Sequence, residues 1–137
     1  MVFTDAELEY LAGQRLGRLA TAQPNGTLQV NPVGFHYNEQ TGTIDIGGFN
    51  MAASRKFRNI ADNGRVAFVV DDIASIQPWR VRCVEIRGYA EAIEAAADGT
   101  APIIRIHPRR VISFGLALDR DPHEIVPDKR DVTDAPS

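Results

Sequence analysis

The sequence predicts a mainly β fold, an antiparallel barrel with a few peripheral helices. Turn signals such as Pro24-Asn25-Gly26 recur at short intervals between runs of β-forming residues, which is typical of hairpins. Helical patterns are few, and strands do not alternate with helices as they do around a parallel sheet. A small closed or split barrel would also leave few strand edges exposed.

The first part of the chain is expected to form a short helix and three strands. Thr4 and Glu7 have the spacing of a capping box at the start of the helix, and Gly13 can end it. The strands are expected over 15–23, 27–37 and 43–46. Pro32 interrupts the second strand, and because proline cannot donate to a strand ladder it marks an edge, a bulge or a break.

A second helix is expected over 54–62, with either Asn50 or Ser54 as its N-cap and Asn63-Gly64 as its stop signal. The helical spacing places three residues on its inner face: Phe57, Ile60 and Ala61. After this helix, the sequence predicts strands over 65–71, 80–94 and 103–115, a loop over 73–79, and a helical turn or loop over 95–102.

We expect one barrel domain over residues 1–118 and a charged tail over 119–137. The tail contains three prolines and few apolar residues, which favours an extended or disordered segment. The alternative is an extended arm that lies over a partner subunit.

Composition narrows the possible functions. A net charge of -3 and a pI near 5.6 argue against a general nucleic-acid binder. No apolar run approaches the roughly 18 residues of a membrane span, and acidic residues stand where a signal peptide needs positive charge. We therefore expect a cytoplasmic protein without a membrane segment. The single cysteine, Cys83, excludes an internal disulfide and a Cys-rich zinc site, and it is expected to be a buried, inert thiol.

The most informative stretch, residues 47–59, runs from a predicted strand through two glycines into the second predicted helix. A helix start presents unpaired N–H groups and the positive end of the helix dipole, so it attracts anions. Ser54, Arg55 and Lys56 add a hydroxyl and two cations at this point. The stretch therefore predicts a phosphate clamp. The alternative is an exposed basic helix face after a glycine-containing turn.

Signatures of other chemistry are absent from the sequence. It contains no P-loop, no Gly-x-Gly-x-x-Gly and no nucleophile elbow, and its histidines are far apart. We therefore predict no metal site and no catalytic side chain. A redox cofactor that carries the chemistry itself would explain this pattern, because the protein then needs only to bind, orient and shield it.

A flat cofactor ring also needs backbone that comes close to it and apolar walls. The segment 31–34 is the candidate for the backbone contact, since Pro32 and Gly34 disturb the regular strand. Phe49, Trp79 and Phe114 are candidates for the walls. The alternative for each aromatic residue is ordinary core packing.

Taken together, these segments resemble the pyridoxamine 5′-phosphate oxidase-like family of flavin and deazaflavin reductases. The resemblance extends over residues 3 to about 116, in five segments: 16–21, 30–35, 53–60, 64–72 and 106–115. It implies a six-stranded antiparallel split β-barrel of the FMN-binding type. It also implies a homodimer with two cofactor sites at the subunit interface.

The resemblance assigns phosphate binding to the Ser-Arg-Lys run at 54–56 and ring contacts to the backbone of 30–34. It also implies that Trp79, Arg80 and the 109–114 strand reach a site across the dimer. The expected cofactor-binding residues are Val30, Asn31, Pro32, Val33, Gly34, Gly48, Phe49, Ser54, Arg55, Lys56, Trp79 and Arg80.

Within this family, the sequence is most similar to the actinobacterial-type subgroup that uses the deazaflavin coenzyme F420. The Asp-Ile-Gly-Gly run at 45–48 and the Ile-x-Pro-Trp-Arg run at 76–80 carry this similarity. The ending at 106–115 also matches, although Phe114 stands where the subgroup commonly has tryptophan. The subgroup implies hydride transfer from reduced F420 to a conjugated or polycyclic acceptor. The alternatives are an FMN-dependent reductase or oxidase of the same fold, and a binding protein for a flavin-like or heme-like ligand without turnover.

Overall fold

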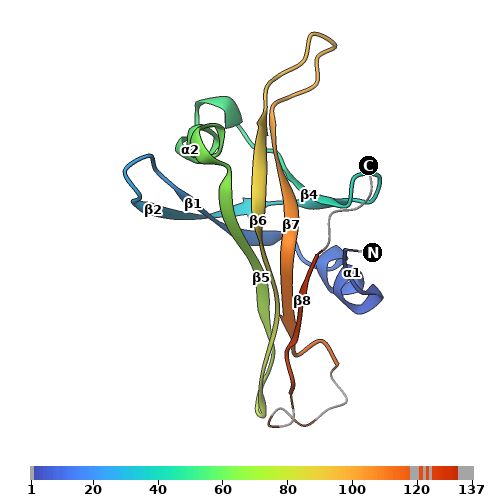
Figure 1. Ribbon diagram of the computed structural model, residues 1–137. Helices are drawn as coiled ribbons and strands as arrows, with labels where there is room; N and C mark the ends of the chain where they lie inside the picture. The colour runs from blue at the N-terminus through green and yellow to red at the C-terminus, as the bar shows by residue number, and fades with distance from the viewer. Residues whose placement is uncertain (1, 118–120, 122, 124, 133–137) are drawn as a thin grey trace.

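The computed structural model describes residues 2–117, 121, 123 and 125–132, and Figure 1 shows a strongly curled sheet with short helices beside it. The elements are α1 (Asp5–Ala12), β1 (Leu16–Ala22), β2 (Leu28–Gly34), β3 (His36–Asn38), β4 (Thr43–Ile46), η1 (Met51–Ala53), α2 (Arg55–Asn63), β5 (Arg65–Ile76), β6 (Trp79–Ile93), β7 (Ile103–Phe114) and β8 (Asp128–Asp131). The predicted mainly β, antiparallel fold class is confirmed. No helix in the described ranges has the length and apolar character needed to cross a membrane.

Among the described residues the sheet has eight strands, in the order β2-β1-β5-β6-β7-β4-β3, with β8 also paired to β7. The sequence predicted six. One of the two additional strands, β3, is the far end of the expected 27–37 strand, which breaks at Phe35 and not at Pro32. The other, β8, comes from the predicted tail.

The two ends of this strand order, β2 and β3, are consecutive in the chain, with only Phe35 between them. The sheet must therefore curl until its edges almost meet. The Phe35 ring packs edge-to-face on Phe68 of β5, with the ring centroids 5.3 Å apart. A Cβ on Gly17 would lie 2.1 Å from the Phe68 ring, so this position on β1 requires glycine. These contacts hold the barrel at the point where it begins to split.

Both helices pack on the inner side of the sheet. In α2, Phe57 and Ile60 are buried as predicted, but Ala61 is exposed and does not belong to the inner face. Asn63 at the end of α2 donates to the carbonyl of Ala22 on β1 at 2.7 Å. This contact and the buried face fix α2 beside the β1–β2 hairpin.

The predicted loop over 73–79 is wrong, because β5 continues to Ile76 and β6 begins at Trp79. The sequence predicts a strand that ends at residue 71. In the structure, however, Asp72 lies opposite Arg82 and forms an ion pair with it, and it accepts a hydrogen bond from the Tyr10 hydroxyl at 2.9 Å. These partners allow a charged residue to continue the strand.

Strand β8 was not predicted, and its residues are charged rather than apolar. It pairs with β7 and directs Arg130 inward to Glu7 of α1, which is fully buried. Ser113 also donates to the Glu7 carboxylate at 2.6 Å, and Arg130 donates to the carbonyl of Val2 at 2.8 Å. This part of the tail is therefore attached to the sheet by an ion pair. The predicted domain boundary at 118/119 lies outside the described residues.

The environment of Glu7 links this network to pH. Burial raises the pKa of Glu7, but the bonds from Arg130, Ser113 and Thr4 outweigh it, and the net pKa lies below the usual glutamate value. A carboxylate with a depressed folded-state pKa stabilises the fold above its unfolded pKa, and this stabilisation is lost as the pH falls through the folded-state value.

We expect Arg130→Ala to destabilise the protein by ~3 kcal/mol, because it leaves the Glu7 carboxylate buried without its cation. Urea unfolding at neutral pH measures this loss. The control is Arg110→Ala, which removes the solvent-exposed pair with Asp131 on the same two strands and should cost less than ~1 kcal/mol. Equal effects of the two variants would contradict the role given to Glu7.

Candidate functional site

The barrel is split where β2 leaves β3. β3 pairs with β4 from His36 to Asn38, whereas β2 turns away after Gly34 to pair with β1. The far side of β2 therefore has no neighbouring strand among the described residues. A strand edge of this kind presents unpaired N–H and C=O groups to whatever occupies the split.

Pro32 shows which backbone groups of β2 face the open edge. It lies opposite Arg18 within the β1–β2 ladder, and proline is tolerated there only if its nitrogen points away from β1. In an antiparallel pair this orientation alternates along the strand. The amides of Val30 and Gly34, two residues to either side, therefore also point to the open edge. The predicted segment 30–34 thus supplies free backbone donors and acceptors.

Helix α2, which contacts β2 through Asn59 and Gln29, begins after Ser54 as its N-cap. The Ser54 hydroxyl accepts from the amide of Phe57 at 3.3 Å and donates to the carbonyl of Met51 at 2.7 Å. Asn50, the other predicted cap, has left-handed backbone (φ 55°) before η1 and makes no capping hydrogen bond through its side chain. The amides of Arg55 and Lys56 have no partner in the described part of the chain. Two free N–H groups at a helix N-terminus form an anion site when a charged side chain supports them.

The cations on the first turns of α2 supply this support. Within the described residues, Arg55, Lys56 and Arg58 make no salt bridge, whereas six arginines of the sheet do: Arg18, Arg82, Arg87, Arg105, Arg110 and Arg130. Arg55 and Arg58 are exposed and Lys56 is half-buried. Positive charge is therefore left uncompensated at the helix start.

The loop before η1 places Gly48 and Phe49 next to this charge. The loop is held by Ile46 on one side and Met51 on the other, both buried. Between them, the side chain of Phe49 is fully exposed (103%). Phe49 is therefore not part of the core, and its ring is available to a ligand.

Two residues that the sequence did not single out, Gln29 and Asn59, connect α2 to β2. Asn59 is 1% exposed, and its amide nitrogen lies 3.0 Å from the Thr21 hydroxyl and 3.3 Å from Oε1 of Gln29. Its own Oδ1 is buried without a hydrogen-bond partner. The one signal in the sequence that could have pointed to Asn59 was its place in the helix, between the inward-facing Phe57 and Ile60.

The structure does not bring Trp79 and Arg80 to this site within one chain. β5 starts directly after α2 and runs eleven residue steps to Ile76, a distance of about 36 Å at ~3.3 Å per residue. Trp79 follows at the tip of the β5–β6 hairpin and is exposed; Figure 1 shows this hairpin pointing away from α2. Within one chain, these two residues therefore lie far from the start of α2.

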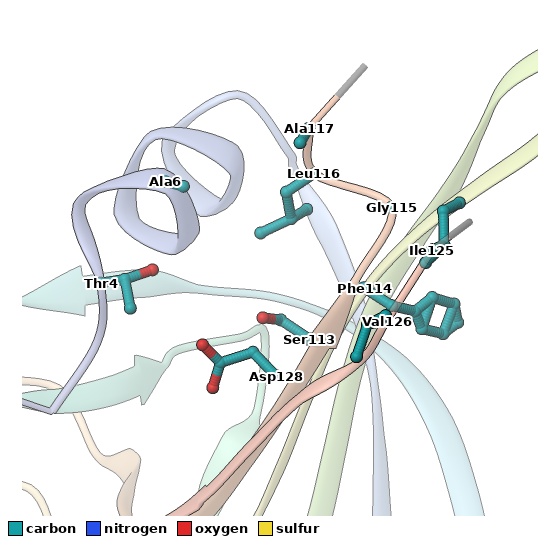
Figure 2. A pocket seen from close by; sticks show the side chains of 10 residues that line it. All are labelled: Thr4, Ala6, Ser113, Phe114, Gly115, Leu116, Ala117, Ile125, Val126 and Asp128. Atoms are coloured by element: carbon teal, nitrogen blue, oxygen red, sulfur yellow. The ribbon is translucent and has the colours of Figure 1, made fainter. Parts of the chain in front are cut away.

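Phe114 lies at a different hollow. Figure 2 shows this cavity of about 300 Å³, between the start of α1, the end of β7 and β8. None of the predicted cofactor-binding residues lines it. The site supported by free amides, uncompensated cations and an open strand edge is the split beside α2.

The sequence and the fold are similar to those of several known proteins. The family model described as pyridoxamine 5′-phosphate oxidase matches residues 3–120. A 5a,11a-dehydrotetracycline/5a,11a-dehydrooxytetracycline reductase from Streptomyces rimosus is 46% identical over 124 residues, covering 87% of each chain. A solved F420 reductase is 26% identical with a TM-score of 0.56, covering 73% of this chain and 91% of its own. An FAD-binding protein from Mycobacterium smegmatis shares the fold, at 19% identity and a TM-score of 0.61, covering 82% of this chain and 95% of its own.

Ser54 has two roles that one substitution separates. In Ser54→Asp the carboxylate can cap α2 as well as the hydroxyl does, so the free energy of unfolding should change by less than ~0.5 kcal/mol. The added negative charge should abolish phosphate binding at the two free amides. Urea unfolding and calorimetric titration with inorganic phosphate measure the two effects. Ser54→Ala is the reverse control, with ~1 kcal/mol lost from stability.

Proposed function

The chain belongs to the pyridoxamine 5′-phosphate oxidase family, and on that premise we propose that it is an oxidoreductase whose flavin-type cofactor binds in the split beside α2. The observation that carries this proposal is the pair of free amides at Arg55 and Lys56, surrounded by cations without a carboxylate partner. The donor set fits a phosphate, and the open edge of β2 fits the polar rim of a tricyclic ring.

Reduced deazaflavin F420 is the cofactor we propose, and it supplies a hydride when bound. The clamp itself suits the phosphate of F420 or of FMN. Two further observations favour F420: the relation to an F420 reductase and the number of cations on α2. Arg55, Lys56 and Arg58 carry more positive charge than one phosphate neutralises, whereas the F420 tail carries carboxylates in addition.

The acceptor we propose is a carbon–carbon double bond in a conjugated, polycyclic substrate, because the relative at 46% identity is named as a reductase of dehydrotetracyclines. In this reaction the protein binds the cofactor and the substrate and orients them toward each other. Holding two reactants in the attacking geometry lowers the barrier by up to ~7–11 kcal/mol in favourable models. Segment 30–34 would fix one side of the ring, and Phe49 would provide an apolar wall beside it.

A second copy of the chain would complete the site. The outer face of the sheet is uncovered in the described part of the chain, since both helices pack inside. A shallow hollow of about 270 Å³ on this face has apolar walls formed mainly by Ala20, Val30, Ala67 and Val69.

Cys83 lies on the same outer face of the sheet and is half-buried. Burial, together with the charges of Asp71 and Glu85, raises the pKa of its thiol to about 11, in keeping with an inert cysteine. We propose that this face forms a homodimer and that the partner's hairpin brings Trp79 and Arg80 to the clamp.

The double variant Arg55→Ala/Lys56→Ala should weaken F420 binding by at least ~3 kcal/mol, roughly a hundredfold, because it removes two charge-assisted contacts to phosphate. Fluorescence titration with F420 and with FMN measures the change. Lys129→Ala removes an exposed charge on β8 and is the matched control. Unchanged affinity in the double variant would move the clamp elsewhere.

The same titration separates the alternatives. Tight binding of FMN alone would indicate the flavin-dependent reductase or oxidase. Anaerobic mixing of the loaded protein with enones and quinones then tests turnover. Binding without acceptor-dependent oxidation of the cofactor would indicate a ligand-binding protein.

Mixing two inactive variants tests whether the hairpin acts across the dimer. One variant lacks the clamp (Arg55→Ala/Lys56→Ala) and the other lacks the hairpin residues (Trp79→Ala/Arg80→Ala). If the hairpin acts in trans, random exchange should restore about one site in four, because one site of each mixed dimer then receives both intact parts. Cofactor binding after refolding the mixture measures the recovery. No recovery would show that clamp and hairpin act in the same chain or not at all.

A further inference from the structure

We propose that the side-chain amide of Gln29, oriented by Asn59, binds the hydroxylated chain that joins the phosphate to the ring of a flavin-type cofactor. This inference rests on the proposed function and adds a binding residue and a positioning residue to the same site. Neither residue belongs to the set that the sequence predicted.

The position of Gln29 follows from the two elements that border the split. On α2, Arg55 and Asn59 are four residues apart and therefore lie on the same helix face. On β2, Gln29 precedes Val30, whose backbone faces the open edge. Because Asn59 contacts Gln29 at 3.3 Å, Gln29 lies between the cations that would hold the phosphate and the strand edge that would hold the ring. In a flavin-type cofactor, the group between phosphate and ring is a polyol.

The hydrogen bonds of Asn59 fix the Gln29 amide. Asn59 is buried and bonded to Thr21 at 3.0 Å, so the end of Gln29 that touches Asn59 is held and the other end of its amide is left for a ligand. Gln29 is only half-buried, so a ligand in the split can reach it. No hydrogen bond from Nε2 of Gln29 exists among the described residues.

The end of the Gln29 amide that does not touch Asn59 is suited to bind a hydroxyl group. If the amides of Asn59 and Gln29 are both turned over, the contact between them persists with donor and acceptor exchanged. Gln29 then presents Oε1 to the split in place of Nε2. A hydroxyl both donates and accepts, so it can bind either end. Neither a carboxylate, which only accepts, nor an ammonium group, which only donates, fits both cases.

The buried cluster also carries a cost that a structural role alone does not explain. Oδ1 of Asn59 has no partner, and a buried acceptor without a hydrogen bond destabilises the fold. An apolar side chain at this helix position would avoid that cost. Retention of the amide is accounted for by the orientation it imposes on Gln29.

The test compares two ligands that differ only in the polyol. One is FMN, and the other is an FMN analogue whose chain keeps the phosphate but has hydrogen in place of the hydroxyls. We expect Gln29→Leu to weaken FMN binding three- to tenfold, the value of one neutral hydrogen bond, and to leave the affinity for the analogue unchanged. Gln40→Leu, in an exposed turn, is the control. If the wild-type chain binds only the deazaflavin ring, the same pair of ligands is made on that ring.

Asn59→Ala should give the same selective loss, together with a change in stability measured by urea unfolding. A loss that is equal for both ligands would mean that Gln29 and Asn59 only maintain the fold, and it would overturn the inference. An unchanged affinity for FMN in Gln29→Leu would also overturn it. Failure of the wild-type chain to bind either cofactor would instead overturn the proposed function.

Discussion

The single-residue connection at Phe35 determines the geometry of this protein. It joins the two edge strands of the sheet, so the sheet must curl, yet one residue is too short a turn to let β2 and β3 pair with each other. The packing of Phe35 on Phe68, which requires glycine at position 17, fixes the place where the strands separate. The split, the open edge of β2 and the position of α2 beside it all follow from this closure.

Charge is distributed unevenly over this frame. Most arginines of the sheet lie opposite carboxylates, as Arg105 does with Asp45 on the neighbouring strand, and such pairs add little field outside the protein. At the start of α2 the helix dipole, two free amides and three unpaired cations act in the same direction. In a chain with a net charge of -3, this concentration of positive potential is local. Such a concentration favours an anionic ligand at the start of α2.

Local signals in the sequence predicted most of the fold. Caps such as Thr4 and Ser54, the turn at 24–26 and the stop at Gly64 act over a few residues, so their consequences can be derived without the structure. Two of the failures were long-range. β8 is held by an ion pair between Arg130 and Glu7, which are 123 residues apart, and the hairpin over 73–79 is held by Asp72, Tyr10 and Arg82. Sequence patterns carry no information about which distant charge will neutralise a buried one.

The same distinction applies to the candidate site. The helix start at 54–56 and its cations could be predicted because they form a local motif, and an irregular strand at 31–34 could be predicted because Pro32 marks it. Gln29 and Asn59 could not, since neither has a distinctive neighbour in the sequence and their contact depends on how α2 lies against β2. Trp79 illustrates the remaining limit. Its motif is local, but its distance from the start of α2 depends on the length of β5, and the sequence predicted a strand that ends at residue 71. The candidate site thus depends on contacts between elements that are distant in the sequence.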